Sequence, residues 1–185
     1  MVMVVFLGAE LSLSAQTSPP FTWEGPVVTK TLFTQDLGML DSEREEYATN
    51  LSILATNQIV KAKGSPQSLV DARRLLGLAL HLSPRNKRAL VTNYQLTKGM
   101  LPEVIEGNYS PQVFARLLLS RGQLLEKQGG DENKRLARYF IHLAANLDPK
   151  NEDAVYICEI QRLDRGEVDW STVTDAPQVP VEKKP

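Results

Sequence analysis

The sequence is short of the residues that most often carry chemistry, with one cysteine and two histidines among 185 residues. The single cysteine, Cys158, excludes an internal disulfide and a zinc site built from several thiolates. Aromatic residues are sparse, at 6% of the chain. The 21 Lys and Arg residues nearly cancel the 22 Asp and Glu residues, and the net charge of -1 supplies no general attraction to nucleic acid or anionic lipid. We therefore predict no nucleic-acid partner.

The bulk composition is that of a soluble globular protein. Hydrophobic residues make up 42% and charged residues 23%, close to the averages for such chains, which excludes wholesale disorder. The length suits one domain with a sizeable core and excludes a large multidomain enzyme.

No apolar run is long enough to span a bilayer as a helix, which takes about 20 residues. The chain begins with the apolar stretch MVMVVFLGA and continues into LSLSAQ and TSPP, a pattern typical of a secretory signal peptide. We predict a signal peptide over residues 1–15, cleaved after Ala15, and therefore an extracytoplasmic protein, periplasmic or secreted. No Lys or Arg precedes the run and Glu10 lies within it, so a frayed terminus of a cytoplasmic protein is the alternative.

Both flanks of the central region lack a helical period. Residues 16–41 carry prolines and glycines around Trp23, which predicts an extended arm whose apolar side chains pack on the body. Residues 169–185 contain three prolines and end on EKKP, a composition that predicts a disordered, solvated tail. Trp170 is the last residue that we expect to dock.

The region 42–168 has the apolar spacing of amphipathic helices, with breaks at recognisable caps. Ser42 and Glu45 form a capping box before the first helix, and Ser65-Pro66 and Ser110-Pro111 open the second and fourth. No stretch reads as a strand, so the predicted fold class is all-α. The six predicted antiparallel helices cover about 43–63, 65–82, 86–99, 111–128, 132–147 and 152–165.

The helical region repeats itself. Residues 72–89 align with residues 137–154 without a gap, at an offset of 65 residues, and eight of the 18 pairs are identical. Such repetition is typical of stacked helical arrays, in which each unit buries its faces against its neighbours. It predicts two related three-helix units.

Each copy contains a small residue, a large apolar residue, a second small residue and a terminal proline, at intervals of four, three and five. These structural positions are Ala72, Leu76, Ala79 and Pro84 in the first copy and Ala137, Ile141, Ala144 and Pro149 in the second. The pattern resembles the second helix of a tetratricopeptide repeat, where small residues let helices approach and proline ends the helix. The resemblance covers about 120 residues and implies a degenerate tetratricopeptide-like array; a generic helical bundle is the alternative.

No local pattern of a nucleophile with its base, or of a metal or cofactor site, occurs in the sequence. His81 and His142 align with Asn146 and Gly77 in the other copy, which favours structural or surface roles. Cys158 occupies a place where the repeat family has a buried apolar residue, so we predict an inert core thiol. We predict no enzyme, no cofactor and no catalytic or metal-binding residue.

The resemblance implies a scaffold that binds a protein or peptide on the surface formed by the first helices of its repeats. The candidate partner-binding residues are Arg88, Val91, Gln95, Lys98, Asp153, Tyr156 and Ile160. Because two copies of the motif cap an array poorly, the alternative is a self-associating structural component of the cell envelope, a homo-oligomer paired through its arm or end helices.

Overall fold

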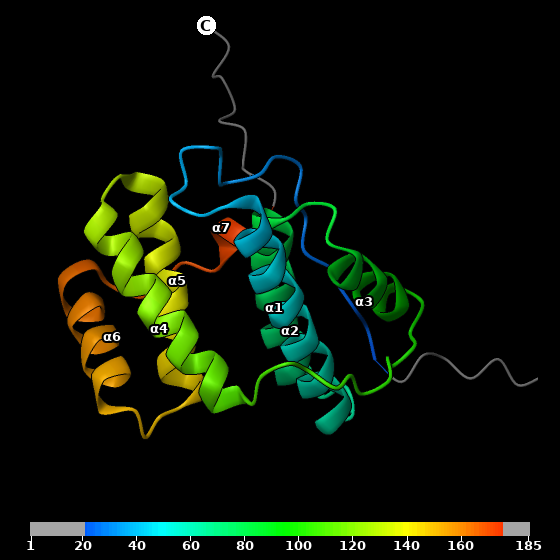
Figure 1. Cartoon of the computed structure of the whole chain (residues 1–185). Coiled ribbons are helices and arrows are strands. Elements are labelled where there is room, and N and C mark those ends of the chain that lie inside the picture. The colour runs from blue at the N-terminus through cyan, green and yellow to red at the C-terminus, as the bar shows by residue number, and fades with distance from the viewer. Residues whose placement is uncertain (1–20, 176–185) are drawn as a thin grey trace, which may run out of the picture.

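The computed structural model describes residues 21–175, and all the regular structure in this range is helical (Figure 1). This confirms the predicted all-α class. The predicted signal peptide, residues 16–20 of the arm and residues 176–185 of the tail lie outside the described residues. None of the described helices combines the length and apolar character needed to cross a membrane. The helices are α1 (Asp41–Lys61), α2 (Pro66–Leu82), α3 (Lys87–Thr97), α4 (Pro111–Gln128), α5 (Asp131–Leu147), α6 (Glu152–Arg165) and α7 (Ser171–Thr174).

The caps of α2 and α4 lie where the sequence predicts them. The Ser65 hydroxyl accepts the Ser68 amide at the start of α2, and the Ser110 hydroxyl accepts the Val113 amide at the start of α4. Each hydroxyl satisfies a backbone donor that would otherwise lack a partner in the first helical turn.

The start of α1 differs from the prediction. The helix begins at Asp41, and the Glu43 carboxylate accepts the backbone N–H of Leu40 at 2.9 Å, so the predicted capping box of Ser42 and Glu45 is wrong. The cause is a tertiary contact. The Glu45 carboxylate accepts a hydrogen bond from the side-chain amide of Asn86 at 2.9 Å and does not cap the helix.

The core is built on two antiparallel helix hairpins, α1 with α2 and α4 with α5. Tyr47 of α1 joins them, because its ring stacks on Phe140 of α5 at 5.0 Å between ring centroids. The small and large apolar motif positions are fully or almost fully buried at the helix contacts, whereas both motif prolines lie exposed beyond the helix ends. The buried motif residues are Ala72, Leu76, Ala79, Ala137, Ile141 and Ala144.

The third helix of each predicted unit lies at a different end of the molecule. Helix α3 packs on α1 and α2, whereas α6 packs on α5. Figure 1 shows α3 and α6 on opposite sides, with both hairpins between them. The two units are therefore related in helix order but do not stack as a continuous series.

Residues 98–110, which we call the crossover, connect α3 to α4 and run back along α1, and so separate α3 from the second hairpin. The Asn57 side chain pairs with the backbone of Ile105 in both directions, accepting its N–H at 2.9 Å and donating to its carbonyl at 2.8 Å. Further along, the Tyr109 hydroxyl donates to Glu46 at 2.8 Å. The chain thus begins α4 on the far side of the first hairpin from α3.

The described part of the arm, residues 21–40, contains no helix or strand and connects the two ends of the molecule. The Trp23 indole donates to Asn93 of α3 at 2.9 Å, and the Gly38 N–H donates to Asn133 of α5 at 2.7 Å. Between these contacts Phe33 is buried in the core. The predicted extended arm is confirmed over this range.

The predicted tail boundary at residue 169 is wrong. Residues 169–175 cross from α5 to α2, form the short helix α7, and bury Val173 completely. The Thr174 carbonyl accepts the Val27 N–H at 2.8 Å, which ties this segment to the arm. Burial of Val173 and this long-range backbone pairing offset the polar composition that suggested a solvated tail.

Candidate functional site

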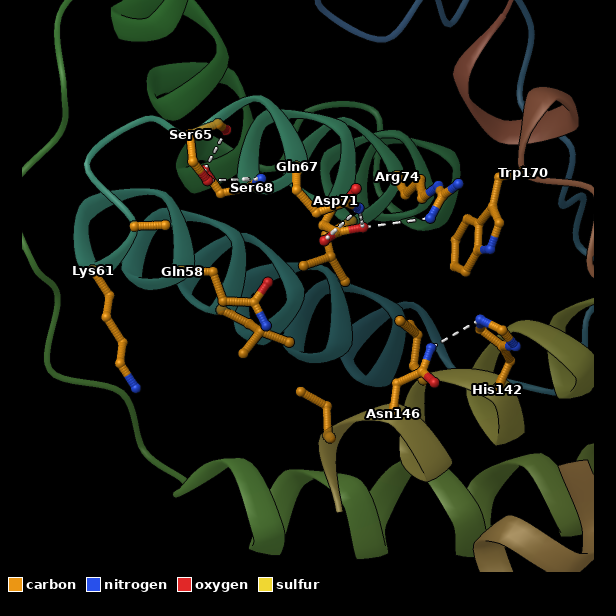
Figure 2. Close-up of a pocket in the computed structure, with 15 residues that line it drawn as sticks. Gln58, Lys61, Ser65, Gln67, Ser68, Asp71, Arg74, His142, Asn146 and Trp170 are labelled. Carbon is orange, nitrogen blue, oxygen red and sulfur yellow. Dashed lines mark hydrogen bonds and ion pairs between the residues drawn. The ribbon is translucent and has the colours of Figure 1, made fainter. Parts of the chain in front are cut away.

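An open cleft of about 740 Å³ lies between the first hairpin and α5 (Figure 2). Its apolar lining comes from leucines on three helices, and we call it the leucine cleft. These residues are Leu54 of α1, Leu75 of α2, and Leu143 and Leu147 of α5. A cavity of this size suits a ligand that brings several apolar groups.

One end of the leucine cleft is closed by Trp170 and a paired charge. The Arg74 guanidinium lies 5.8 Å from the centre of the Trp170 ring and 3.4 Å from the Asp71 carboxylate. The Gln67 amide also donates to Asp71, at 3.1 Å to each carboxylate oxygen. This end therefore offers an aromatic face and charges that already neutralise each other.

The other end is polar and carries an uncompensated positive charge. Gln58 and the exposed Lys61 come from the last turns of α1, and Lys61 forms no ion pair with any other described residue. The hydroxyls of Ser65 and Ser68, which also line the cleft, hydrogen-bond to each other at 3.1 Å. This end is suited to an anionic group on a ligand.

A second cavity, of about 280 Å³, brings together a cysteine, a histidine and an asparagine. The Cys158 sulfur lies 3.9 Å from Nδ1 of His142, and Nε2 of His142 lies 2.9 Å from the side-chain amide of Asn146. Cys158 is half-buried rather than in the core, because α6 packs on one side only. The three residue types and their order are those of a thiol nucleophile with its base and orienting group.

Electrostatics keep this cluster neutral. Burial raises the pKa of the Cys158 thiol, and the carboxylates of Glu159 and Glu167 add to the increase. Burial also lowers the pKa of His142. Both changes disfavour a thiolate paired with an imidazolium, which is the reactive form of such a pair. Cys158 also lies within α6, where the backbone N–H groups are engaged in helix hydrogen bonds and cannot stabilise an oxyanion.

The other histidine has a structural role. His81 is buried in α2, and its Nδ1 accepts the backbone N–H of Leu32 at 3.2 Å. Burial lowers its pKa from 6.5 to about 4, so it is neutral at physiological pH.

The predicted partner-binding residues fall into two groups that the structure separates. Three lie on α3 with Lys98 at its C-cap, and three lie on α6 at the opposite side of the molecule; none of them lines the leucine cleft. The α3 group is Arg88, Val91, Gln95 and Lys98, and the α6 group is Asp153, Tyr156 and Ile160. All are exposed except Gln95, which is half-buried.

Sequence reasoning missed the leucine cleft. Leu82 and Leu147 occupy the same place in the alignment of the two copies, but Leu82 is buried whereas Leu147 is half-exposed at the cleft. The difference depends on which segments cover each hairpin, and no local signal encodes it. Only Trp170, expected to dock, pointed toward this region.

Among residues 21–175, no three His, Cys, Asp or Glu side chains lie close enough together to hold a metal ion. No protein-family model matches this chain, and no curated protein or solved structure compared with it does so either.

Proposed function

We propose that this chain is a degenerate tetratricopeptide-like module, without enzymatic activity, that binds a segment of another polypeptide in the leucine cleft. The observation that carries the proposal is the leucine-lined cleft between the first hairpin and α5, in which Leu54 and Leu147 are partly exposed above the buried Leu75 and Leu143. Apolar side chains from a partner segment would cover the exposed parts of Leu54 and Leu147 and remove them from water, and burial of apolar surface is the main favourable term in association.

The charges along the leucine cleft define the chemistry of the segment. The Asp71 and Arg74 side chains pair with each other, whereas Lys61 at the opposite end has no such partner among the described residues. A segment with two or more Leu, Ile, Met or Phe side chains and an acidic residue at one end fits this pattern. Its aromatic or aliphatic side chain at the other end would pack against Trp170.

The absence of enzymatic activity is supported by the state of the polar groups around the leucine cleft. The hydroxyls of Ser65 and Ser68 bond to each other and to backbone groups, with no base among their hydrogen-bond partners. His142 bonds to Asn146 and sits beside a thiol whose pKa is raised. An activated nucleophile requires a hydroxyl that is hydrogen-bonded to a general base, or a thiol whose pKa is lowered.

Export of the mature protein is part of the proposal, and it rests on the apolar N-terminal sequence. Mass spectrometry of the protein expressed with its upstream DNA tests it. A mature N-terminus near Gln16 in a soluble extracytoplasmic fraction would support export. An intact Met1 in the cytoplasm would contradict it and leave the binding proposal unaffected.

Binding is tested by selecting ligands from a displayed random-peptide library on the immobilised full-length protein. We expect enriched peptides to combine spaced Leu, Ile, Met or Phe residues with one Asp or Glu. Two variants block the cleft, Asn146→Trp by filling it and Leu147→Asp by placing a charge on its floor. Leu124→Asp, on the exposed face of α4 outside the cleft, is the matched control.

We expect both blocking variants to bind the selected peptides with about 10-fold or more lower affinity, and Leu124→Asp to bind them as the wild type does. Lys61→Glu should weaken the binding of peptides that carry an acidic residue. Changing that peptide residue to Lys should restore affinity for the Lys61→Glu variant. Selection of no peptide, or of peptides whose binding ignores both blocking variants, would refute the cleft as a binding site.

A further inference from the structure

The outward face of α3 is apolar and basic. Opposite the buried face of this helix lie Leu90, Val91 and Tyr94, of which Tyr94 is 62% exposed. Lys87 and Lys98 lie on the same outward stripe, and the Lys98 ammonium is 5.4 Å from the centre of the Tyr94 ring. No acidic residue occurs between Arg85 and Lys98. We call this surface the basic end face.

The outward face of α6 is apolar and acidic. Tyr156, Ile160 and Leu163 recur at intervals of four and three along it, with Tyr156 68% and Leu163 70% exposed. Glu152 and Asp153 precede them in the first turn. We call this surface the acidic end face.

The ion pairs of the described chain leave these two faces with opposite charge. The arginines of α6 are engaged within the molecule, Arg162 with Glu159 at 2.8 Å and Arg165 with Glu126 at 2.8 Å. Glu152 and Asp153 have no cationic partner among residues 21–175. Within the same range the cations of the basic end face have no acidic partner either. Both faces therefore combine exposed apolar side chains with unpaired charge of complementary sign.

We infer that copies of this chain associate head to tail, with the basic end face of one copy docked on the acidic end face of the next. Tyr94 and Tyr156 would form the centre of the contact, flanked by lysines on one side and carboxylates on the other. Because the two faces lie at opposite sides of the molecule, one contact leaves the second face of each copy free. The contact is heterologous, and repetition produces a ring or an open chain of subunits.

Charge argues against pairing of like faces. Two basic end faces would bring four or more cations together around Tyr94, and two acidic end faces would do the same with carboxylates around Tyr156. Like charges placed directly opposite each other are destabilising, whereas the head-to-tail contact pairs them. The proposal does not involve the leucine cleft, so it stands or falls independently of the peptide-binding proposal.

Complementation between two variants tests the proposal. The first variant, Val91→Ser with Tyr94→Ser, removes two of the three apolar side chains of the basic end face without changing its charge. The second, Tyr156→Ser with Leu163→Ser, does the same to the acidic end face. All four side chains are exposed, so the folds are expected to be intact by circular dichroism. Val104→Ser, at a position 68% exposed on the crossover, is the matched control.

The measurement is sedimentation velocity over a wide range of protein concentration. The average mass of the wild type and of Val104→Ser should increase with protein concentration. Each double variant alone should associate about 30-fold more weakly, as expected when aromatic side chains at the centre of a contact are truncated. An equimolar mixture of the two variants should form a closed 1:1 dimer, because each supplies the face that the other lacks, and should grow no further.

Three results would overturn the proposal. A wild type that is monomeric at every concentration excludes association. Self-association of one double variant with loss in the other indicates pairing of like faces. Variants that both associate as the wild type does show that a different surface is used.

Discussion

The backbone carbonyl of Val173 in α7 rests directly on Gly77 of α2, in the space that a Cβ atom at position 77 would occupy. Close approach of this kind is possible only at glycine. The contact fixes the segment that also carries Trp170, which closes one end of the leucine cleft. Glycine, which is unfavourable within a helix, thus stands in α2 at the position where residues 169–175 dock.

Gly77→Ala should release α7 from α2. Alanine gains about 1 kcal/mol of helix propensity, but the clash with the Val173 carbonyl costs about 1–3 kcal/mol. The Val27 amide reports docking directly, because it donates to Thr174 at 2.8 Å. Its hydrogen exchange should accelerate in Gly77→Ala, and also in Val173→Ala, which removes the buried side chain without a clash. Unchanged exchange with increased overall stability would show that α7 accommodates the methyl group.

Helix limits were predictable because the signals that set them are local. Ser65 before Pro66 and Ser110 before Pro111 each cap a backbone donor three residues away, and the observed starts of α2 and α4 agree. The error at α1 has the converse cause. Glu45, three residues after Ser42, is held by Asn86, a partner 41 residues along the chain.

The placement of the helices was not predictable from their pattern. Equivalent helices α3 and α6 occupy opposite ends because irregular segments direct them, through pairs such as Asn57 with Ile105 and Trp23 with Asn93. These segments have no periodicity from which a course could be inferred. The leucine cleft and the separation of the two predicted residue groups both result from that placement.

His81 should make the folded state less stable as pH falls. Burial lowers its pKa from 6.5 to about 4, so between these values the unfolded chain binds a proton that the folded chain does not. The stabilisation is complete above pH 6.5 and is lost progressively toward about pH 4, with a total on the order of 3 kcal/mol. Urea unfolding across this range measures it.

The control for this effect is His81→Gln. The glutamine oxygen can still accept the Leu32 N–H that bonds to His81 Nδ1, but the side chain does not titrate. Subtracting the two pH profiles removes the contribution of the carboxyl groups common to both proteins. Profiles that run parallel would contradict the assignment of the pH dependence to His81.

Arg44→Lys should destabilise the protein by about 3 kcal/mol, because a lysine cannot reproduce the planar fork of the guanidinium. Buried Arg44 donates to the carbonyls of Leu82, Thr34 and Phe33, each at 3.0 Å, and so ties the arm to α1 and α2. The same change at exposed Arg116 should alter stability by less than about 0.5 kcal/mol. Denaturant unfolding measures both changes. Equal losses of stability in the two variants would show that the Arg44 hydrogen bonds do not contribute specifically to stability.

Cys158 should react slowly with iodoacetamide near neutral pH, even though His142 lies beside it. The thiolate is the reactive form, and burial together with Glu159 and Glu167 raises the thiol pKa above its usual value. The alkylation rate should therefore rise with pH beyond the point at which a free cysteine in a model peptide levels off. Mass spectrometry of the modified chain over a pH series measures this rate.

His142→Gln separates a neutral pair from an activated one. In a neutral pair the imidazole contributes no positive charge to hold the thiolate, so the substitution should leave the alkylation profile of Cys158 almost unchanged. In an activated pair the wild type would react rapidly at neutral pH, and removing His142 would abolish that reactivity. The second result would identify Cys158, His142 and Asn146 as a nucleophile, its base and its orienting group, and would overturn the proposal of a module without enzymatic activity.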